Sequence, residues 1–394
     1  MELIQVILKS GKEQSIRRLH PWVFSGAIKE MSRKPAEGDV VEVLDNKNEF
    51  LALGHFQVGS IAVRIFSFEK VRIDDIFWKN KLKAAIHFRQ QLGYFNNPDL
   101  NVFRLVHGEG DDMPGLIVDY YNGTAVLQAH SVGMYLLREK LALLLKQLLT
   151  DKLTAVYDKS EGTLPFKAGL DPHDSYLLGE PDQNEVLEYG NRFSIDWEQG
   201  QKTGFFIDQR ENRKLLAAYS AGKKVCNVFG YTGGFSVYAL KAGATLVHSV
   251  DASKQAIELT RKNVELNFGS EAPHEGFAMD AFDFFNQTQE TYDVVVLDPP
   301  AFAKHQKALH NALQGYKKIN QKALEQIKPG GILFTFSCSQ AVSREEFRKS
   351  VFAASVNARR KVRILHQLTQ PADHPISIYH PESEYLKGLV LHVE

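Results

Sequence analysis

Several features that would indicate a secreted, membrane-bound or metal-binding protein are rare or missing in this sequence. Only two of the 394 residues are cysteines, Cys226 and Cys338, which excludes a disulfide framework and favours a reducing compartment. No window approaches the roughly 20 uninterrupted apolar residues of a membrane helix. The N-terminus has neither the apolar core nor the cleavage site of a signal peptide. No cysteine and histidine cluster has metal-ligand spacing, so we expect a cytoplasmic protein with no metal and no membrane partner.

The chain also has no net charge, because 47 lysines and arginines balance 47 aspartates and glutamates. The charge is uneven along the chain, however. Residues 299–324 contain five lysines and no acid, residues 1–35 carry seven basic side chains against three acidic ones, and residues 359–363 hold four more basic side chains. Each cluster alone is typical of a solvated face. Three of them in a neutral chain indicate a surface for a polyanion.

The length and the 44% of hydrophobic residues predict two or three domains with real cores. Residues 1–70 contain short apolar runs separated by turn residues, which predicts a small β-rich module. Its residues 20–24 (HPWVF) form an aromatic cluster for which core packing and exposure are equally open. Residues 71–190 predict a small α+β domain, and residues 191–394 alternate strands and helices around a parallel sheet. We therefore expect an α/β chain that ends in a Rossmann-like domain.

The G-x-G-x-x-G pattern of nicotinamide sites is missing as well. Residues 225–229 are an apolar run typical of a strand buried on both faces, and the pattern G-x-x-G-G (Gly230, Gly233, Gly234) follows. A helix and a second strand ending at Asp251 come next. This order is typical of an adenosine site with the acid on the ribose hydroxyls. Without a pyrophosphate pattern, S-adenosylmethionine fits better, and the alternative is a doubly wound domain without a cofactor.

Five chemically useful positions fall at predicted strand ends: Gly230, Asp251, Asp280, Asp298 and Cys338. In open α/β sheets ligands bind beyond the carboxyl ends of the strands, so these positions should converge. The adenine amino group is the expected partner of Asp280, although an acid there is equally typical of a helix N-cap. This convergence is the strongest functional signal in the chain.

The segment Asp298-Pro299-Pro300 places a carboxylate at a rigid strand end, and Phe302 after it offers a ring on which a flipped-out base could stack. The two cysteines differ in position. Cys226 lies inside a predicted strand and should be a small buried hydrophobe. Cys338 follows a strand on the ligand side, and one strand should separate the two, about 10 Å apart at roughly 4.8 Å per strand. That distance excludes a disulfide and leaves Cys338 free.

Residues 202–210 (KTGFFIDQR), the glycine turn, residues 298–302 (DPPAF) and residues 337–339 (SCS) occur in an order that resembles the bacterial large-subunit ribosomal RNA cytosine-5 methyltransferases. The match extends to residues 20–26, 104–119 and 381–388 and covers essentially the whole chain. The resemblance implies an N-terminal PUA RNA-binding domain, a central domain and a methyltransferase domain. It further implies methyl transfer from S-adenosylmethionine to C5 of a cytosine in 23S ribosomal RNA. The oligomeric state is left open, a homodimer included.

The resemblance also implies residue roles. Cys338 would be the nucleophile that adds to C6 of the base, since C5 of cytosine alone has too little electron density to attack a methyl sulfonium. Asp298 would hold the base edge and favour the adduct. The base that removes the C5 proton is not assigned, and Glu382 and Glu384 are candidates. Expected cofactor-binding residues are Phe205, Asp208, Arg210, Asn227, Phe229, Gly230, Tyr231, Thr232, Gly233, Asp251, Asp280 and Asp298, of which Phe205, Asp208 and Arg210 rest on resemblance alone. Expected substrate-binding residues are Pro299, Pro300, Phe302 and Lys304.

Three other functions compete with this reading. An RNA base N-methyltransferase would also use a D-P-P-x-F loop but needs no thiol. A non-catalytic ribosome-assembly factor would use only the PUA-like module, which leaves the cofactor pattern unexplained. A protein methyltransferase would leave both the PUA-like module and the lysine clusters unexplained.

Overall fold

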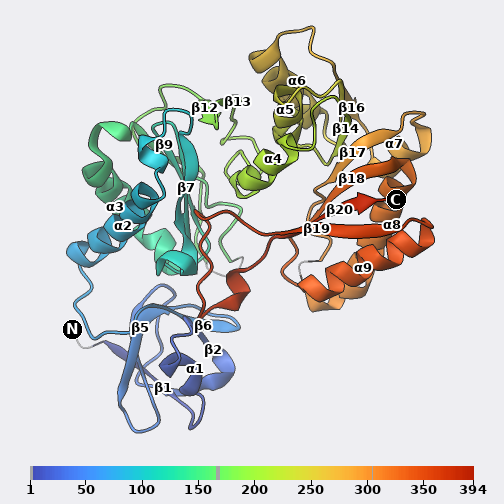
Figure 1. Cartoon of the computed structure of the whole chain (residues 1–394). Helices are drawn as coiled ribbons and strands as arrows, with labels where there is room; N and C mark the ends of the chain where they lie inside the picture. The colour runs from blue at the N-terminus through green and yellow to red at the C-terminus, as the bar shows by residue number, and fades with distance from the viewer. Residues whose placement is uncertain (1–2, 166–168, 304) are drawn as a thin grey trace. The chain divides into compact units, whose positions relative to one another are not determined.

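The computed structural model describes residues 3–165, 169–303 and 305–394, and its contacts divide the chain into two compact units (Figure 1). The first unit consists of Met1–Tyr189, Ile195–Ile207 and Ala372–Ser383, and the second of Gly190–Ser194, Asp208–Pro371 and Glu384–Glu394. Two separate sheets lie within the first unit, so the domain boundaries near residues 70 and 190 stay predictions. In the described part of the chain, no helix is both long and apolar enough to cross a membrane.

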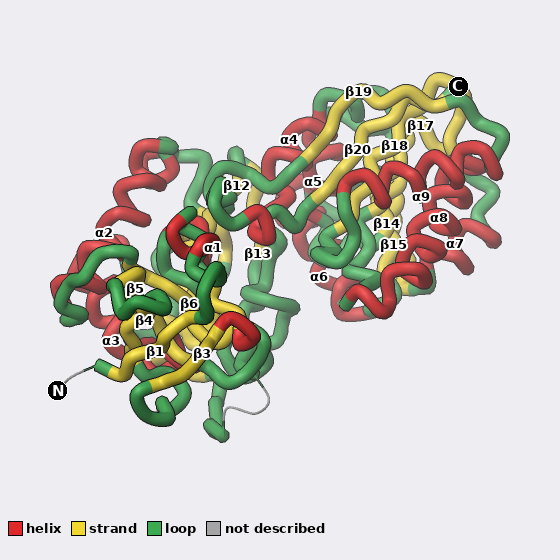
Figure 2. The backbone as a smooth tube through the Cα atoms, turned by 90° about the horizontal axis from the view of Figure 1, so that it is seen from below, coloured by secondary structure: helices red, strands yellow, loops and turns green. Residues whose placement is uncertain are grey.

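The N-terminal sheet of the first unit has six strands in the order β2-β6-β5-β4-β1-β3 (Figure 2). Alternating apolar side chains such as Ile4, Val6 and Leu8 of β1 are buried in its core, as the period-two pattern predicts. The pairs are antiparallel except β1 with β4. The elements are β1 (Ile4–Leu8), α1 (Gln14–Arg17), β2 (Trp22–Phe24), β3 (Ile28–Met31), β4 (Val40–Leu44), β5 (Phe50–Phe56) and β6 (Ile61–Ser67).

The second sheet of this unit has five strands in the order β11-β10-β9-β8-β7, and helices α2 and α3 pack against each other and against it (Figure 1). Ser131 caps α3 by accepting a hydrogen bond from the backbone of Met134, as expected of serine before an apolar helix. The elements are α2 (Asp75–Gln91), β7 (Val102–His107), β8 (Leu116–Tyr121), β9 (Thr124–Ala129), α3 (Val132–Leu149), β10 (Ala155–Asp158), β11 (Ser175–Leu178) and β12 (Glu185–Glu188).

A segment from near the C-terminus, residues 372–383, belongs to the first unit. The carboxylate of Asp373 accepts a hydrogen bond from the backbone N–H of Arg104 at 2.9 Å, and its carbonyl accepts one from the buried Arg89 at 2.7 Å. The ring of Trp22 packs on His380 with centroids 4.2 Å apart. Within the aromatic cluster of residues 20–24, both readings are therefore realised: Val23 is in the core, whereas Phe24 is 46% exposed.

The second unit is a seven-stranded sheet in the order β16-β15-β14-β17-β18-β20-β19, parallel except that β20 is antiparallel to both neighbours. Helices α4, α5 and α6 lie on one face and α7, α8 and α9 on the other (Figures 1 and 2). The carboxyl ends of β14, β15, β17 and β18 meet at one edge, because parallel strands run in the same direction. The Rossmann-like fold expected from the alternating pattern is confirmed.

The strands of this unit are β13 (Asn191–Ser194), β14 (Lys224–Val228), β15 (Leu246–Asp251), β16 (His274–Ala278), β17 (Tyr292–Leu297), β18 (Ile327–Ser337), β19 (Val362–Leu368) and β20 (Lys387–Val393). The helices are α4 (Arg210–Ala217), α5 (Gly234–Lys241), α6 (Lys254–Phe268), α7 (Ala281–Gln287), α8 (Leu309–Gln326) and α9 (Arg344–Asn357).

Candidate active site

The glycine turn between β14 and α5 is a strained segment that hydrogen bonds hold in place. Phe229 and Tyr231 have φ of 62° and 44°, a left-handed conformation that costs non-glycine residues on the order of 1–3 kcal/mol each. The carbonyl of Tyr231 accepts a hydrogen bond from Thr260 Oγ1 at 2.7 Å, and the carbonyl of Thr232 accepts one from Asn263 Nδ2 at 2.9 Å. Side chains of α6 therefore fix a backbone conformation that a free chain would avoid.

The last part of the turn requires glycine for two reasons. Gly233 has φ of 77°, and a Cβ there would lie 2.6 Å from Cγ2 of Thr260. A Cβ on Gly234, the first residue of α5, would lie 2.9 Å from Cδ of Arg213. Gly230 is less constrained, since the nearest atom to its Cβ would be Nδ2 of Asn227, at 3.1 Å. The G-x-x-G-G spacing thus reflects close packing of the turn against α4 and α6.

Asp251 lies directly beside this turn, as the strand-end argument predicted. Its carboxylate accepts hydrogen bonds from the backbone N–H of Tyr231 at 3.0 Å and of Ser253 at 2.9 Å. Asn227 is fully buried beneath the turn, where Nδ2 donates to Ser236 Oγ at 2.9 Å and Oδ1 has no hydrogen-bond partner within the ranges that the structure describes. The acid keeps acceptor capacity for ribose hydroxyls, because each carboxylate oxygen accepts more than one hydrogen bond.

Asp280 follows β16 and is the N-cap of α7. Its carboxylate accepts a hydrogen bond from the backbone N–H of Phe282 at 2.8 Å, and the side chain is exposed. Of the two roles that the sequence left open for Asp280, the helix N-cap is therefore present. The contact with the adenine amino group stays a prediction.

Two carboxylates come together where β17 ends. The pKa of Asp298 is raised to about 7 by burial and by the charge of Asp208, although part of the residue is accessible to solvent. Asp208 accepts a hydrogen bond from the Tyr385 hydroxyl at 2.8 Å, while its other oxygen is buried and has no hydrogen-bond partner among the described residues. An acidic pair of this kind suits a cation, which would lower the energy of both ionised carboxylates.

The two cysteines are free and lie in different environments. Cys226 is fully buried in β14, where burial raises the pKa of its thiol. Cys338 follows β18, is partly exposed, and its Sγ lies 3.9 Å from the carbonyl oxygen of Pro299. Burial and the charge of Asp298 raise the pKa of Cys338 to about 12. Strand β17 separates β14 from β18, as predicted.

The predicted substrate-binding residues lie after β17. Pro299 is buried and Pro300 exposed. Phe302 is half-buried, because its ring packs on Tyr316 of α8 with centroids 4.7 Å apart. Only part of this ring is open for a base. Lys304 lies outside the described residues.

Sequence reasoning did not find two residues of this site, Tyr385 and Lys387. Lys387 is 4% exposed at the start of β20, and its Nζ donates to the carbonyl oxygen of Ser339 at 2.7 Å. Burial lowers the pKa of Lys387 to about 8. Both residues lie in the segment 381–388, which pointed to function only as part of the resemblance to the family.

The remaining predicted residues belong to the first unit, are fully buried, or are ion-paired. Phe205 is buried in the first unit, and Arg210 is fully buried in α4. Glu382 belongs to the first unit, where His20 lies 3.5 Å from its carboxylate. Glu384 belongs to the second unit and accepts a hydrogen bond from Nε of Arg344 at 2.8 Å.

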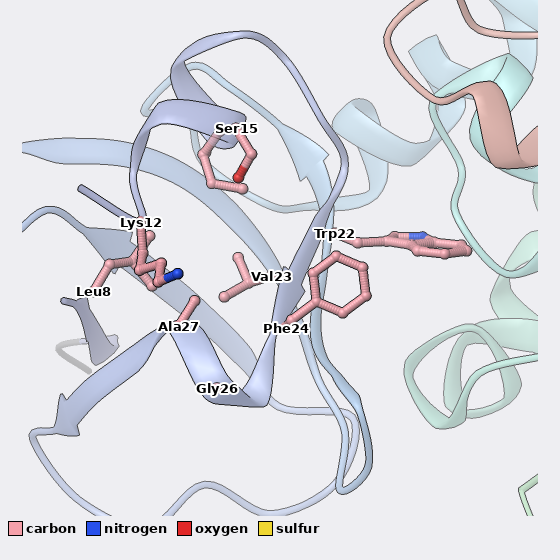
Figure 3. A pocket seen from close by; sticks show the side chains of 9 residues that line it. Leu8, Lys12, Ser15, Trp22, Val23, Phe24, Gly26 and Ala27 are labelled. Carbon is pink, nitrogen blue, oxygen red and sulfur yellow. The ribbon is translucent and has the colours of Figure 1, made fainter. Parts of the chain in front are cut away.

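A second candidate surface is a cavity of about 310 Å³ in the N-terminal sheet. Figure 3 shows Lys12, Val23 and Phe24 among the residues that line it. Nε1 of Trp22 donates to Glu109 at 2.8 Å. Most of the lining is apolar, and Lys12 is its charged residue: Leu8, Lys12, Ser15, Ile16, Trp22, Val23, Phe24, Gly26 and Ala27.

The residues around the glycine turn fit S-adenosylmethionine. The Asp208 oxygen that has no hydrogen-bond partner in the described part of the chain provides for a sulfonium cation, and Asp251 provides for a ribose. The turn lacks the glycine pattern of pyrophosphate-binding loops, and its glycines allow the backbone to come close to a ligand.

Comparisons with known proteins agree with this site. Residues 103–377 match the family model of S-adenosylmethionine-dependent methyltransferases, and residues 6–68 match that of a PUA-like domain. The ribosomal RNA large subunit methyltransferase I of Alteromonas mediterranea is 38% identical over 99% of this chain and 98% of its own. That of Cronobacter sakazakii is 37% identical over 99% of both chains.

A solved structure shares the fold. A protein crystallised in complex with SAH superposes with a TM-score of 0.86 at 23% identity, covering 99% of this chain and 100% of its own. With a family model across most of the chain and full-length relatives above 30% identity, this protein belongs to the ribosomal RNA large subunit methyltransferase I family and uses S-adenosylmethionine as its cofactor.

Proposed function

We propose that this protein methylates C5 of a cytosine in 23S ribosomal RNA through a transient bond between Cys338 and C6 of the base. The observation that carries the proposal is the position of Cys338. It is a free, partly exposed cysteine at the edge of the sheet where Asp298 and the glycine turn lie, whereas Cys226 is fully buried. A thiol at this edge is required for carbon methylation and has no task in nitrogen methylation.

The chemistry divides among a few side chains. Sulfur of Cys338 adds to C6, which makes C5 enamine-like and able to attack an electrophile. S-adenosylmethionine supplies, when bound, a methyl group activated by the sulfonium. With a pKa of about 7, part of the Asp298 population is protonated near neutrality, so it can donate a hydrogen bond to the base edge. The half-buried ring of Phe302 supports the flipped base from one side.

Ribosomal RNA as the substrate is supported by the relatives' names and by basic surfaces on this chain. Helix α8 carries lysines that follow the DPP loop, and its charge suits a phosphate backbone. In the PUA-like domain, Lys12 and the exposed ring of Phe24 beside the cavity would contact a nucleotide through charge and stacking. The proposed methylation of ribosomal RNA takes place in the cytoplasm.

One observation favours a second candidate, methylation of a base nitrogen. The pKa of Cys338 is about 12, so the thiol is neutral in the free protein, and a nitrogen nucleophile needs no thiolate. The same D-P-P-x-F loop would bind the base in that reaction.

RNA that carries 5-fluorocytosine at the target position separates the two. Fluorine cannot leave as the C5 proton does, so carbon methylation leaves the RNA bonded to sulfur. We expect a shifted band on a denaturing gel that requires S-adenosylmethionine and disappears in Cys338→Ala. Bisulfite sequencing of 23S RNA from a strain lacking the gene should show loss of one protected cytosine. Methylation without an adduct, by an active Cys338→Ala enzyme, would establish the nitrogen reaction instead.

A further inference from the structure

Lys387 is a buried lysine in the candidate active site, and among the residues that the structure describes its charge has no ion-pair partner. It is 4% exposed, and among the described residues its one hydrogen bond goes to the carbonyl oxygen of Ser339. Glu384 acts on it electrostatically but is paired with Arg344. Burying a lysine without a carboxylate partner is costly, and an apolar side chain of the same length would be more stable there. Such a residue is usually retained for function.

The fold places Lys387 next to Cys338. In the antiparallel pair of β18 and β20, Lys387 stands opposite Ser337, the residue before Cys338. Its Nζ then bonds to the carbonyl of Ser339, the residue after Cys338. The lysine therefore contacts the residues on both sides of Cys338, at the carboxyl edge of the sheet. The charges of Lys387 and Cys338 also act on each other electrostatically.

Two carboxylates that act on the thiol work against its ionisation. Asp298, after β17, and Asp208, before α4, both raise the pKa of Cys338. Tyr316 of α8 stays neutral, since its own pKa is raised to about 12. The Lys387 ammonium is the side-chain charge that lowers the pKa of Cys338 in the described part of the chain. The reaction needs a thiolate in a place where burial and two carboxylates oppose one.

We propose that Lys387 is the proton acceptor of Cys338, taking the thiol proton as sulfur adds to the base. This inference rests on the proposed carbon methylation. The amine lone pair binds the proton from Sγ, and the electrons of the S–H bond form the new S–C6 bond. The C5–C6 π electrons move onto C5 and form its bond to the methyl group, and the electrons of the former S–CH3 bond stay on the sulfur of S-adenosylmethionine. The resulting ammonium stands beside the sulfur. After C5 carries its methyl group, its original proton leaves to solvent, and those electrons form the C5–C6 double bond. The C6–S electrons leave with sulfur, and the ammonium returns its proton to the thiolate.

The pH dependence follows from the same groups. Because burial and Arg344 of α9 lower the pKa of Lys387 to about 8, part of the amine is neutral near physiological pH and can accept a proton. The kcat of the wild type should therefore rise with pH and level off above about 8. Without the amine, this inflection should disappear.

The full-length protein should be compared as wild type, Lys387→Met and Lys387→Arg. Arginine keeps the charge but cannot accept a proton, because it is always protonated. We expect both variants to lose about 100-fold or more in kcat at pH 8, the usual range for a proton-transfer residue, with affinity for S-adenosylmethionine within about threefold of wild type. Lys387→Met should melt at the same or a higher temperature. The matched control is Lys328→Met, a lysine of the same sheet that is ion-paired with Asp293 at 3.3 Å and should keep full kcat.

A second measurement needs no RNA. Alkylation of Cys338 by iodoacetamide, followed by intact mass with Cys338→Ala as the blank, should be at least about tenfold slower at pH 8 in Lys387→Met. Equal alkylation rates, or a Lys387→Arg enzyme with wild-type kcat, would overturn the proposal. If wild-type enzyme methylates RNA without a 5-fluorocytosine adduct, carbon methylation itself is wrong, whereas an adduct formed equally fast by wild type and Lys387→Met rejects Lys387 alone.

Discussion

The glycine turn and the region around Cys338 lie at the carboxyl edge of the same sheet, but they are built in opposite ways. In the turn, Thr260, Asn263 and Asp251 satisfy backbone groups and hold strained residues in one conformation. Around Cys338, buried titratable groups are shifted against their charged forms. Asp298 has a raised pKa and Lys387 a lowered one. The first region is organised for binding before the ligand arrives. The second becomes favourable only when charge moves during the reaction.

The largest expected effect separates the two cysteines. Cys338→Ala should reduce methylation at least about 10³-fold, as removal of a nucleophile does, while leaving S-adenosylmethionine binding unchanged. Cys226→Ala should retain activity and cost about 1–2 kcal/mol of stability, because a buried sulfur is lost from the core. Methylation assays and denaturant unfolding measure these effects. Full activity of Cys338→Ala would show that the region around Cys338 does not carry out the reaction.

Asp298→Asn tests whether the buried Asp298 carboxylate lowers the free energy of unfolding of the folded protein. The folded protein keeps the Asp298 proton up to a pKa of about 7, whereas the unfolded chain loses it near 3.8, the ordinary pKa of an aspartate. The folded state therefore binds more protons between these values, and the free energy of unfolding falls as pH rises through this window. Asparagine cannot ionise, so at pH 8 the variant should be more stable by roughly 2–4 kcal/mol and yet inactive. Equal stability of both proteins from pH 4 to pH 8 would contradict the assignment.

These effects also show how far the sequence could be read. The strand-end positions of Asp251, Asp298 and Cys338 were predictable, because one short-range pattern, alternating strands and helices, decides which ends meet. The position of β20 between β18 and β19 was not, since β20 pairs with residues of β18 that precede it by about 50 to 60 positions, which leaves no local period. Nothing in the local sequence around Lys387 therefore indicated that its side chain would be buried.

The same limit applies to charge and strain. Whether Asp280 caps α7 or reaches a ligand depends on its φ and ψ, which the residue type leaves open. The membership of residues 372–383 in the first unit depends on contacts such as Asp373 with Arg104, across 269 positions.

In the binding region, Asp251→Ala should weaken S-adenosylmethionine binding by roughly 1.5–3 kcal/mol, as expected for loss of hydrogen bonds to a charged group. The variant loses a ribose acceptor and also the acceptor for the backbone N–H of Tyr231. Titration calorimetry gives the affinity. Tight binding of NADH in place of S-adenosylmethionine would refute the cofactor assignment.

Gly233→Ala should destabilise the protein by about 2 kcal/mol, because both a positive φ and a contact of 2.6 Å with Thr260 oppose the new methyl group. Gly243→Ala is the matched control: its φ is 87°, but nothing lies within 4 Å of its Cβ position. The difference between the two variants in urea unfolding isolates the packing of the turn on α6. Identical losses would mean that backbone strain alone requires glycine.

The smallest effect concerns Asp280, where capping and cofactor binding make different demands on one side chain. Asp280→Ala removes the oxygen that accepts from Phe282 and should cost about 1 kcal/mol of stability. Asp280→Ser restores a cap oxygen without a charge and should return to within a few tenths of a kcal/mol of wild type. If the carboxylate also contacts the adenine amino group, the serine variant should still bind S-adenosylmethionine about three- to tenfold more weakly, because a charged acceptor becomes a neutral one. Wild-type affinity in a fully stable Asp280→Ser protein would make Asp280 a cap alone, and the cofactor contacts of this edge would then end at Asp251.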